Sequence, residues 1–480
     1  MFWRRGLVVG IVVLLVGAVF LPCFSGNIKN MSVRASDYHR AATGKNIIYV
    51  DDDSPSPGDG TWDWPYCKIQ DAIDNACAGD DIHVCNGTYK DKGPVCRIDK
   101  SLTIYAGGDD PHGGDTQYPP IINASYFNNT IVVTTNDVTI TGFDITGSSK
   151  ENGTAADGGL VYWYSGIRVE PVVSNCNILK NIIHHNGAGI RAYGYTFIIN
   201  NTICDNLDDG IKVRAGYIEN NYIARNGRVE TKALPSNADG IEIYGISGTS
   251  IINNTIIDNQ VDGIWDDTGD RHTISGNIIE NNHQGGIDLF EARRCMITNN
   301  NIISNGYFGI YMNVGSSNTI ANNNISNNVI GIFFKSSSSN SIENNIISYN
   351  TQIGIYLEES SSNNFIKNFI LYNIEGIYDY KSSNNIIYNN DFRENNISIE
   401  LTFSIRDVIV FNNIATTSTI KLRATCSFAI APINWWGDWR GPWHNMKRRI
   451  SFVLVFPWSP IEFPINSAST QYLKNSYPKV

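Results

Sequence analysis

The sequence predicts an all-β protein, a single-stranded right-handed parallel β-helix built from coils of 22–23 residues. Two recurring motifs indicate this fold. An Asn within the motif Ile-x-x-Asn-x-Ile recurs from Asn181 to Asn412, and from Asn254 onward every step is 22 or 23 residues. A Gly-Ile pair recurs with a similar period from Gly166 to Gly376. A fixed period of this size is typical of a solenoid, in which each repeat buries its apolar face against its neighbours.

Each repeat has the composition expected of short strands joined by tight corners. Runs rich in Ile alternate with polar residues, which indicates half-buried strands, and three such runs fit one coil. We expect the recurring Asn to sit at a corner in the left-handed conformation and to form a hydrogen-bonded ladder from coil to coil. We expect the Gly at another corner, where a positive φ or a close backbone approach is needed. A leucine-rich repeat has a similar length but requires regularly spaced Leu, which is absent here.

The first 45 residues precede the predicted fold. Residues 1–26 begin with a basic segment followed by an apolar run of 16 residues from Gly6 to Leu21. This pattern predicts a secretory signal peptide, with an uncleaved N-terminal anchor as the alternative. Residues 27–45 are polar and are interpreted as a linker. The protein is therefore expected to be extracellular or on the cell surface, with membrane contact only through this N-terminal segment.

Residues 46–110 differ from the repeats and are predicted to form an N-terminal cap and the first coil. Apolar residues from Ile69 to Ala76 follow helical spacing, which predicts a short amphipathic helix over the open end of the barrel. Four cysteines fall in this region. In an exported cap they favour two disulfides, with a zinc site as the alternative that the lack of any Cys-x-x-Cys disfavours. These cysteines are Cys67, Cys77, Cys85 and Cys96.

The remaining chain divides into the β-helix, residues 111–430, and a C-terminal cap and tail, residues 431–480. One repeat is 30 residues long, and its insertion at 228–236 is predicted to be a protruding loop. Five Trp fall within 24 residues near the C-terminus and are expected to cover the end of the barrel.

Several repeats resemble a known family. The motifs Gly-Ile-Tyr-Met-Asn at 309–313, Ser-Ser-Ser-Asn-Ser-Ile at 337–342 and Asn-Asn-Ile-Ile-Ser-Tyr-Asn at 344–350 are similar to NosD-like repeats, part of the pectate-lyase-like β-helix group. The resemblance covers residues 46–440 and implies the fold. It does not specify one activity, because this fold carries lyases, hydrolases, epimerases, adhesins and inert surface proteins. The eight His and five Met are scattered, so a soft-metal site is not supported.

The Gly-Ile strand presents the most informative surface. Strand alternation points its Ile inward, so the next residue and the one two further on point outward. These outward positions are charged in the early coils and aromatic in the later ones. Regularly spaced rings suit stacking against the sugars of a long polymer, whereas the alternative is cross-strand pairing for stability alone. The predicted substrate-binding residues are Arg191, Tyr193, Tyr244, Trp265, Phe290, Tyr311, Phe333, Tyr356 and Tyr378.

An acidic cluster on the coils spanning residues 208–291 gives a sharper hypothesis. A carboxylate precedes the Gly of three consecutive coils, at Asp209, Asp239 and Asp262. Stacked like charges raise a pKa or bind a cation. Paired carboxylates suit a sugar hydrolase, and a Lys or Arg base beside Ca²⁺ suits a lyase or epimerase. The alternative is that each Asp-Gly is only a turn. The candidate catalytic residues are Asp209, Asp239, Glu242, Asp262, Asp267, Asp288, Lys212 and Arg214.

Two functional hypotheses follow. The first is a secreted or cell-surface protein that binds polysaccharide along the Gly-Ile strand face without turnover. The alternative is a polysaccharide lyase, hydrolase or epimerase that uses the acidic cluster. The net charge of −10 argues against nucleic acid as a partner. Ca²⁺ is the one cofactor that the pattern suggests, and the sequence assigns it no ligands.

Overall fold

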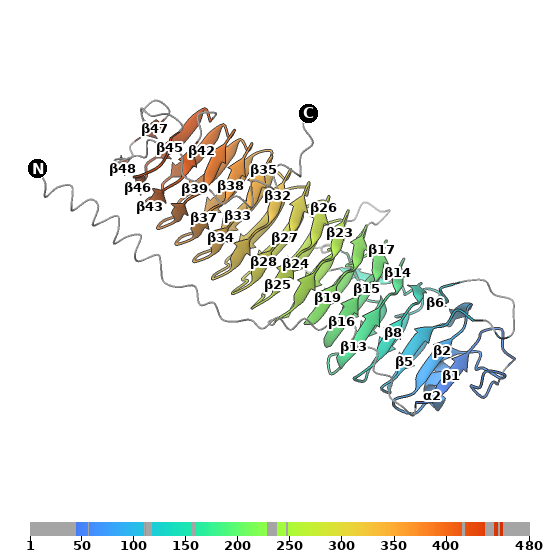
Figure 1. Cartoon of the computed structure of the whole chain (residues 1–480). Helices are drawn as coiled ribbons and strands as arrows, with labels where there is room; N and C mark the ends of the chain where they lie inside the picture. The colour runs from blue at the N-terminus through green and yellow to red at the C-terminus, as the bar shows by residue number, and fades with distance from the viewer. Residues whose placement is uncertain are drawn as a thin grey trace, which may run out of the picture. The chain divides into compact units, whose positions relative to one another are not determined.

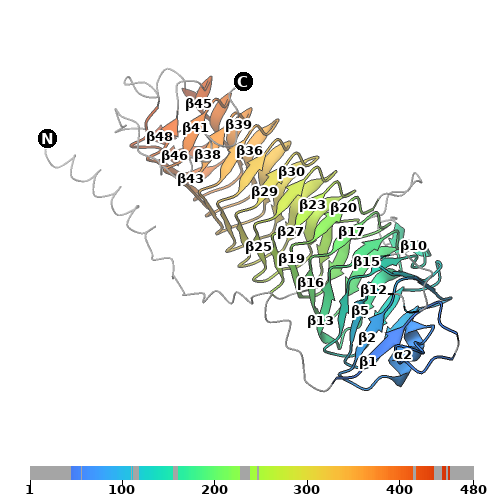
Figure 2. The ribbon, with the colours of Figure 1, turned by 45° about the vertical axis from the view of Figure 1, so that its right-hand side comes forward.

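The structure is a computed structural model, and it describes residues 45–55, 57–109, 111, 118–154, 160–227, 238–245, 248–414, 418–436, 446–449 and 452–454. Residues from Asn46 onward form one compact unit. Within it, short strands repeat along a single axis from the blue N-terminal end to the red C-terminal end (Figures 1 and 2). Each coil contributes one strand to each of three parallel sheets, so the chain is a right-handed parallel β-helix, as predicted.

The three sheets run the length of the coil stack, and each strand pairs in parallel with its counterpart one coil away. Sheet A contains β1 (Ile47–Val50), β2 (Asp81–Val84), β5 (Thr103–Ala106), β8 (Thr139–Thr141), β13 (Ser174–Leu179), β16 (Tyr195–Ile199), β19 (Gly216–Glu219), β22 (Ser250–Ile252), β25 (Thr273–Ser275), β28 (Met296–Thr298), β31 (Thr319–Ala321), β34 (Ser341–Glu343), β37 (Asn364–Ile366), β40 (Ile386–Tyr388), β43 (Ile405–Val410), β46 (Phe428–Ile430) and β48 (Phe452–Leu454).

Sheet B follows sheet A in each coil. It contains β3 (Thr88–Lys90), β6 (Ile121–Asn123), β9 (Asp144–Thr146), β14 (Ile182–His184), β17 (Thr202–Cys204), β20 (Tyr222–Ala224), β23 (Thr255–Ile257), β26 (Ile278–Glu280), β29 (Asn301–Ile303), β32 (Asn324–Ser326), β35 (Ile346–Ser348), β38 (Phe369–Leu371), β41 (Asp391–Arg393) and β44 (Asn413–Ile414).

Sheet C contains the Gly-Ile strands. Its members are β4 (Cys96–Ile98), β7 (Ile131–Val133), β12 (Ser165–Val169), β15 (Ala188–Ala192), β18 (Ile211–Val213), β21 (Ile241–Ile243), β24 (Asp262–Asp266), β27 (Gly285–Phe290), β30 (Phe308–Asn313), β33 (Ile330–Lys335), β36 (Ile353–Glu358), β39 (Glu375–Tyr380), β42 (Ile397–Thr402), β45 (Ile420–Thr425) and β47 (Met446–Arg449). A separate antiparallel hairpin, β10 (Asn152–Thr154) and β11 (Leu160–Tyr162), precedes β12.

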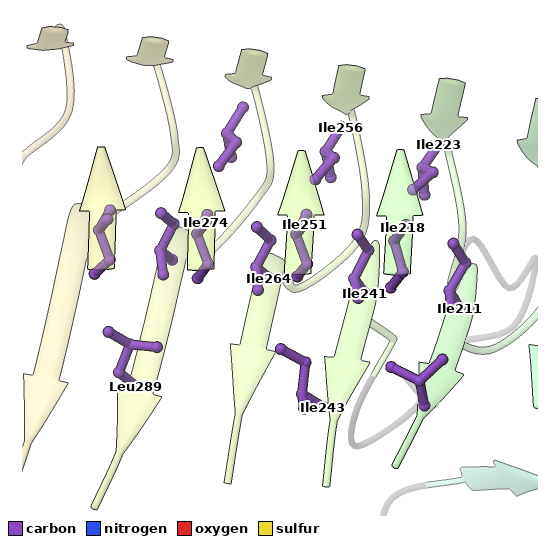
Figure 3. Packing of buried hydrophobic residues seen from close by; sticks show 14 of the residues in the cluster. Ile211, Ile218, Ile223, Ile241, Ile243, Ile251, Ile256, Ile264, Ile274 and Leu289 are labelled. Carbon is purple, nitrogen blue, oxygen red and sulfur yellow. The ribbon is translucent and has the colours of Figure 1, made fainter. Parts of the chain in front are cut away.

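The core consists of inward-facing Ile columns, one set per sheet. Figure 3 shows Ile218, Ile251 and Ile274 stacked in register on successive strands of sheet A, with equivalent columns from the other two sheets. These side chains are fully buried. Burying an Ile of this kind stabilises a fold by roughly 1.5–3 kcal/mol, so the repeated columns supply much of the solenoid's stability.

The predicted asparagine ladder is present inside the corner between sheets A and B. Asn277 is typical: its Oδ1 accepts the backbone N–H of Asn254 at 2.8 Å, and its Nδ2 donates to the carbonyl oxygen of Ile251 at 2.9 Å. The left-handed residue, however, is the one before each ladder Asn, for example Asn253 with φ 54°. The sequence therefore identified the corner correctly, but it placed the positive φ one residue late.

The Gly of each Gly-Ile pair is required for space rather than for positive φ. A Cβ on Gly263 would lie 2.7 Å from the carbonyl oxygen of Gly286 and 2.6 Å from a methyl of Ile279. Gly263 is not among the glycines with positive φ. Of the two reasons predicted for these glycines, close backbone approach is the one that applies.

The N-terminal end of the barrel carries the predicted helix, α2 (Ile69–Asn75), which buries Ile69, Ala72 and Ile73 in the common core. The expected disulfides are not formed among the described residues, where none of the four cap cysteines is joined to another cysteine. Cys96 is buried on β4 and pairs in register with Ile131. It therefore acts as a small apolar core residue, and burial raises the pKa of its thiol to about 12.

At the other end, Trp436 is fully buried in the core and Asn434 is the last member of the asparagine ladder. The other expected cap tryptophans, apart from Trp435, lie outside the described residues, as do residues 1–44 with the predicted signal and linker, and the predicted loop at 228–236. Within the described part of the chain, no helix is long and apolar enough to cross a membrane.

Candidate functional site

The predicted face lies on sheet C, and the strand register aligns its outward residues into one column. Each residue pairs with the next one coil on, through eleven successive strands. We call this set the sheet C column. In order it contains Arg168, Arg191, Lys212, Glu242, Trp265, Asp288, Tyr311, Phe333, Tyr356, Tyr378 and Glu400.

The later part of the column is a continuous aromatic ladder. Phe333 and Tyr356 stack with ring centroids 4.6 Å apart and planes 11° apart, and Tyr356 and Tyr378 stack at 5.2 Å and 8°. Tyr311 joins the ladder at 5.0 Å from Phe333 with a 44° tilt. Because the inner rings cover one another's faces, they offer their edges to a ligand. The sequence predicted that sugars would stack on free ring faces. In this geometry the ring edges, rather than the faces, are available to a sugar. Trp265 and Phe290 make no ring contact with other described residues.

The early part of the column is charged and internally paired. Nη2 of Arg191 donates to Oδ2 of Asp208 at 2.6 Å, and Nζ of Lys212 forms a short ion pair with Glu242. Arg168 pairs with Glu170 on the same strand at 2.9 Å. Most of these positive charges therefore already have an acidic partner.

The three corner carboxylates form a ladder of their own rather than an open acidic cleft. The backbone N–H of Asp239 donates to Oδ1 of Asp209 at 3.0 Å, and the backbone N–H of Asp262 donates to Oδ1 of Asp239 at 2.9 Å. All three side chains are buried, at 1–2% exposure. This arrangement gives each Asp an architectural role similar to that of the asparagine ladder.

Burial makes these carboxyl groups weak acids. It raises the pKa of Asp208 to about 7, with the neighbouring Asp209 as a second cause, and the pKa of Asp262 to about 8. Burial and the nearby carboxylates raise the pKa values of Asp239 and Glu242 well above the ordinary range. Carboxyl groups with such pKa values are largely protonated in mild acid.

One part of the predicted catalytic set does converge. The neighbouring Asp209 carboxyl contributes to the raised pKa of Glu242, and both carboxyls interact with Lys212. Asp288 lies two coils beyond Glu242 in the column, half-buried, where burial raises its pKa to about 7. Asp267 is half-buried and Arg214 is exposed at the rim.

Two groups of buried carboxyls lie outside the candidate catalytic set. Asp266 and His272 are fully buried and lie 3.6 Å apart between Oδ1 and Nε2. Farther along, Asp379 accepts a hydrogen bond from Nδ2 of Asn385 at 3.0 Å, while Asp407 accepts the Asn385 backbone N–H at 3.0 Å. The alternation of inward and outward residues along each strand could have predicted that Asp266 and Asp379 point inward. They pair in register with Leu289 and Leu401, respectively.

The described residues contain no group of three or more His, Cys, Asp or Glu side chains arranged to hold a metal ion. The suggestion of Ca²⁺ therefore gains no ligand set from the geometry. The zinc alternative for the cap cysteines likewise gains none.

Comparison with known proteins agrees with this architecture. A family described as a right handed beta helix region matches residues 239–392, and a family of unknown function, DUF1565, matches residues 55–267. The first of these descriptions agrees with the right-handed β-helix that the structure shows. No curated protein matches it in sequence.

Solved structures of β-helix proteins are similar at low sequence identity. The catalytic unit of a thermostable α-1,3-glucanase from Streptomyces thermodiastaticus is 15% identical, with a TM-score of 0.52 over 71% of this chain and 66% of that one. The Dettilon tailspike protein is 16% identical, with a TM-score of 0.44 over 71% and 66%. A mannuronan C-5 epimerase A-module from Azotobacter vinelandii is 12% identical, with a TM-score of 0.39 over 81% and 93%. This chain thus spans just under two thirds of the glucanase and tailspike chains.

Proposed function

We propose that this β-helix protein binds an extended glycan along the outward face of sheet C without chemical turnover. The observation that carries the proposal is the aromatic ladder of Tyr311, Phe333, Tyr356 and Tyr378, half-buried and in register on four consecutive coils. An extended polymer can contact such a ladder at every coil, because both repeat along the same axis.

Polar groups alongside the ladder support this function. A second outward column, Asn313, Lys335, Glu358 and Tyr380, runs beside the rings in register. Sugars present apolar C–H groups together with many hydroxyls, so rings beside hydrogen-bonding side chains suit their chemistry. The α-1,3-glucanase with the same fold acts on a glycan, which agrees with the proposal. We further propose that residues 1–26 export the protein to the cell surface or beyond.

A binding panel tests the proposal. The full chain and Tyr356→Ala are run by affinity electrophoresis through gels that contain neutral, carboxylated or sulfated polysaccharides. Tyr372→Ala is the matched control, because Tyr372 also stacks on a Tyr, Tyr349, at 4.6 Å but lies outside sheet C. Loss of one stacking ring is expected to weaken binding by about tenfold. Equal effects of the two substitutions, or no binding to any polysaccharide, would contradict the function.

The neighbouring carboxyls of Glu242 and Asp209 beside Lys212 favour a second candidate, a polysaccharide-cleaving or epimerising enzyme. A protonated Glu242 has the pKa direction of a general acid. Its side chain is only 4% exposed, however, so substrate access would require movement of its surroundings. An assay for reducing ends, unsaturated products and epimerised sugars, with Ca²⁺ and EDTA arms, decides between the candidates. Activity that Glu242→Gln abolishes would establish the enzyme.

A further inference from the structure

We propose that the N-terminal coils of sheet C carry a subsite for the anionic groups, carboxylate or sulfate, of an acidic glycan. Arg191, Arg214 and Tyr244 form this subsite, which we call the anion subsite. The inference rests on the proposed function and adds the class of glycan to it.

The first observation is a pair of buried hydrogen-bond donors that find no acceptor among the described residues. Arg191 is only 7% exposed; its Nη2 donates to Asp208 and its Nη1 to the carbonyl oxygen of Trp163 at 3.4 Å, but no described residue accepts from its Nε. The hydroxyl of Tyr244 is likewise buried with no hydrogen-bond partner in the described part of the chain. An unsatisfied buried polar group costs about 1–3 kcal/mol, and such a group in a native fold calls for an explanation. A ligand that supplies acceptor atoms provides one.

The second observation is that these donors belong to one group of side chains. Tyr244 packs edge-on against Tyr193 with centroids 5.9 Å apart, and Nζ of Lys212 lies 5.6 Å from the centre of the Tyr244 ring. Burial raises the pKa of the Tyr244 hydroxyl, and the charges of Arg214 and Arg191 oppose that rise. Arg214 and Tyr244 follow the paired residues Val213 and Ile243, so the two residues directly follow adjacent strands of sheet C.

The third observation is an exposed cation, Arg214, for which the described residues supply no ion-pair partner. Arg214 is exposed and forms no ion pair with any described residue, in contrast to Arg168, Arg191 and Lys212. It also lines, together with Tyr193, a cavity of about 400 Å³ beside the column. An anionic group in this cavity would therefore meet the exposed guanidinium of Arg214 beside Tyr193, the ring on which Tyr244 packs.

The chemistry of these donors selects the ligand class. A guanidinium presents paired N–H groups that match the oxygens of a carboxylate or a sulfate. Neutral sugar hydroxyls do not require a cation. An anionic glycan offers such oxygens to this subsite together with sugar rings to the aromatic ladder, so it is the polymer that fits both.

The test measures affinity of the full chain for polygalacturonate, dextran sulfate and neutral dextran at fixed ionic strength, with single-stranded DNA as a further arm. We expect at least one anionic glycan to bind about tenfold more tightly than dextran, and Arg214→Gln to remove that preference. The carboxylate and sulfate arms identify which anion is bound. Arg271→Gln is the matched control, because it removes another exposed guanidinium, on the loop that precedes β25.

Tyr244→Phe provides a second variant that keeps the packed ring and removes only the hydroxyl. This variant is expected to bind the anionic glycan more weakly and to bind dextran with unchanged affinity. Equal losses for Arg214→Gln and Arg271→Gln, equal affinity for charged and neutral glycans, or tighter binding of DNA would overturn the anion subsite. If Tyr356-dependent dextran binding persists in any of these cases, the proposed function still stands, whereas absence of all glycan binding removes both.

Discussion

The backbone N–H of Asp262 donates to Oδ1 of Asp239 at 2.9 Å, one coil away. Asp239 therefore serves the stack as a hydrogen-bond acceptor, which an amide oxygen provides equally well. Its neighbours Asp262 and Asp209 raise its pKa further beyond the effect of burial. The hydrogen bond gives Asp239 a structural role in the coil stack that requires no catalytic activity.

Asp239→Asn is accordingly expected to keep the hydrogen bond and remove the electrostatic cost. At pH 8 the variant should gain about 1 kcal/mol of unfolding free energy, or about 1–3 °C in Tm. At pH 4, where the carboxyl is protonated, little change is expected. Thermal unfolding of both proteins at the two pH values measures this. A large loss of stability in the variant at pH 8 would contradict the ladder role.

The stability of the whole chain should depend on pH in a defined direction. Burial raises the pKa values of Asp262 and Asp266 to about 8, and those of Asp208 and Asp288 to about 7. A raised pKa means that the folded chain binds protons which the unfolded chain has released, so stability falls as pH rises from about 4 through about 8.

His272 acts in the opposite direction, since burial lowers its pKa to about 4 and its contribution is lost as pH falls from 6.5. With four carboxyls against one imidazole, we expect Tm to fall from about pH 5 to pH 9, with a loss of at least about 3 kcal/mol. Calorimetry at constant ionic strength measures the profile. A Tm that stays level or rises above pH 7 would show that these carboxyls are not buried as described.

Removing one amide from the asparagine ladder should damage two coils at once. Asn300→Ala takes the acceptor from the backbone N–H of Asn277 and the donor from the carbonyl oxygen of Ile274. Two buried groups left unpaired cost about 2–4 kcal/mol. The control is Asn299→Gly, because Asn299 has φ 58° and Gly adopts that conformation freely. Urea unfolding of both variants should show a loss only for Asn300→Ala.

The close approach of coils at the Gly-Ile corner gives another prediction. Gly263→Ala places a methyl 2.7 Å from the Gly286 carbonyl oxygen and should cost about 1–3 kcal/mol through overpacking. Gly108→Ala meets nothing within 4 Å and should be nearly neutral. If both substitutions have the same effect on the urea midpoint, the spacing of the coils is not what requires glycine.

The sequence predicted the parts of this fold that repeat. The Asn and Gly periods define the coil length. The alternation of inward Ile with outward residues then assigns which side chains face outward on sheet C. A second ladder, from Asn186 to Asn395, lies inside the next corner and has the same period. It was not predicted, although these Asn residues recur in the sequence once per coil like the first set.

The details of the site could not be predicted in the same way. Whether Asp209 lies in a cleft or inside a corner depends on how adjacent coils pack, which the repeat period does not specify. The orientation of the rings could not be predicted either. Strand alternation places Tyr356 on the outward face, but the stacking of its ring on Phe333 and Tyr378 follows from coil spacing and side-chain rotamers. Asp266 occupies an inward position that is apolar on the next coil. Its burial therefore follows from its place in the strand alternation and not from the hydrophobic pattern.

The most direct test of glycan binding along sheet C is hydroxyl-radical footprinting of the full chain with and without a bound polysaccharide, read by mass spectrometry. We predict protection of Tyr311, Tyr356 and Tyr378, with Tyr349 and Tyr372 oxidised equally in both samples. Protection of Tyr349 and Tyr372 without protection of the sheet C rings would contradict it.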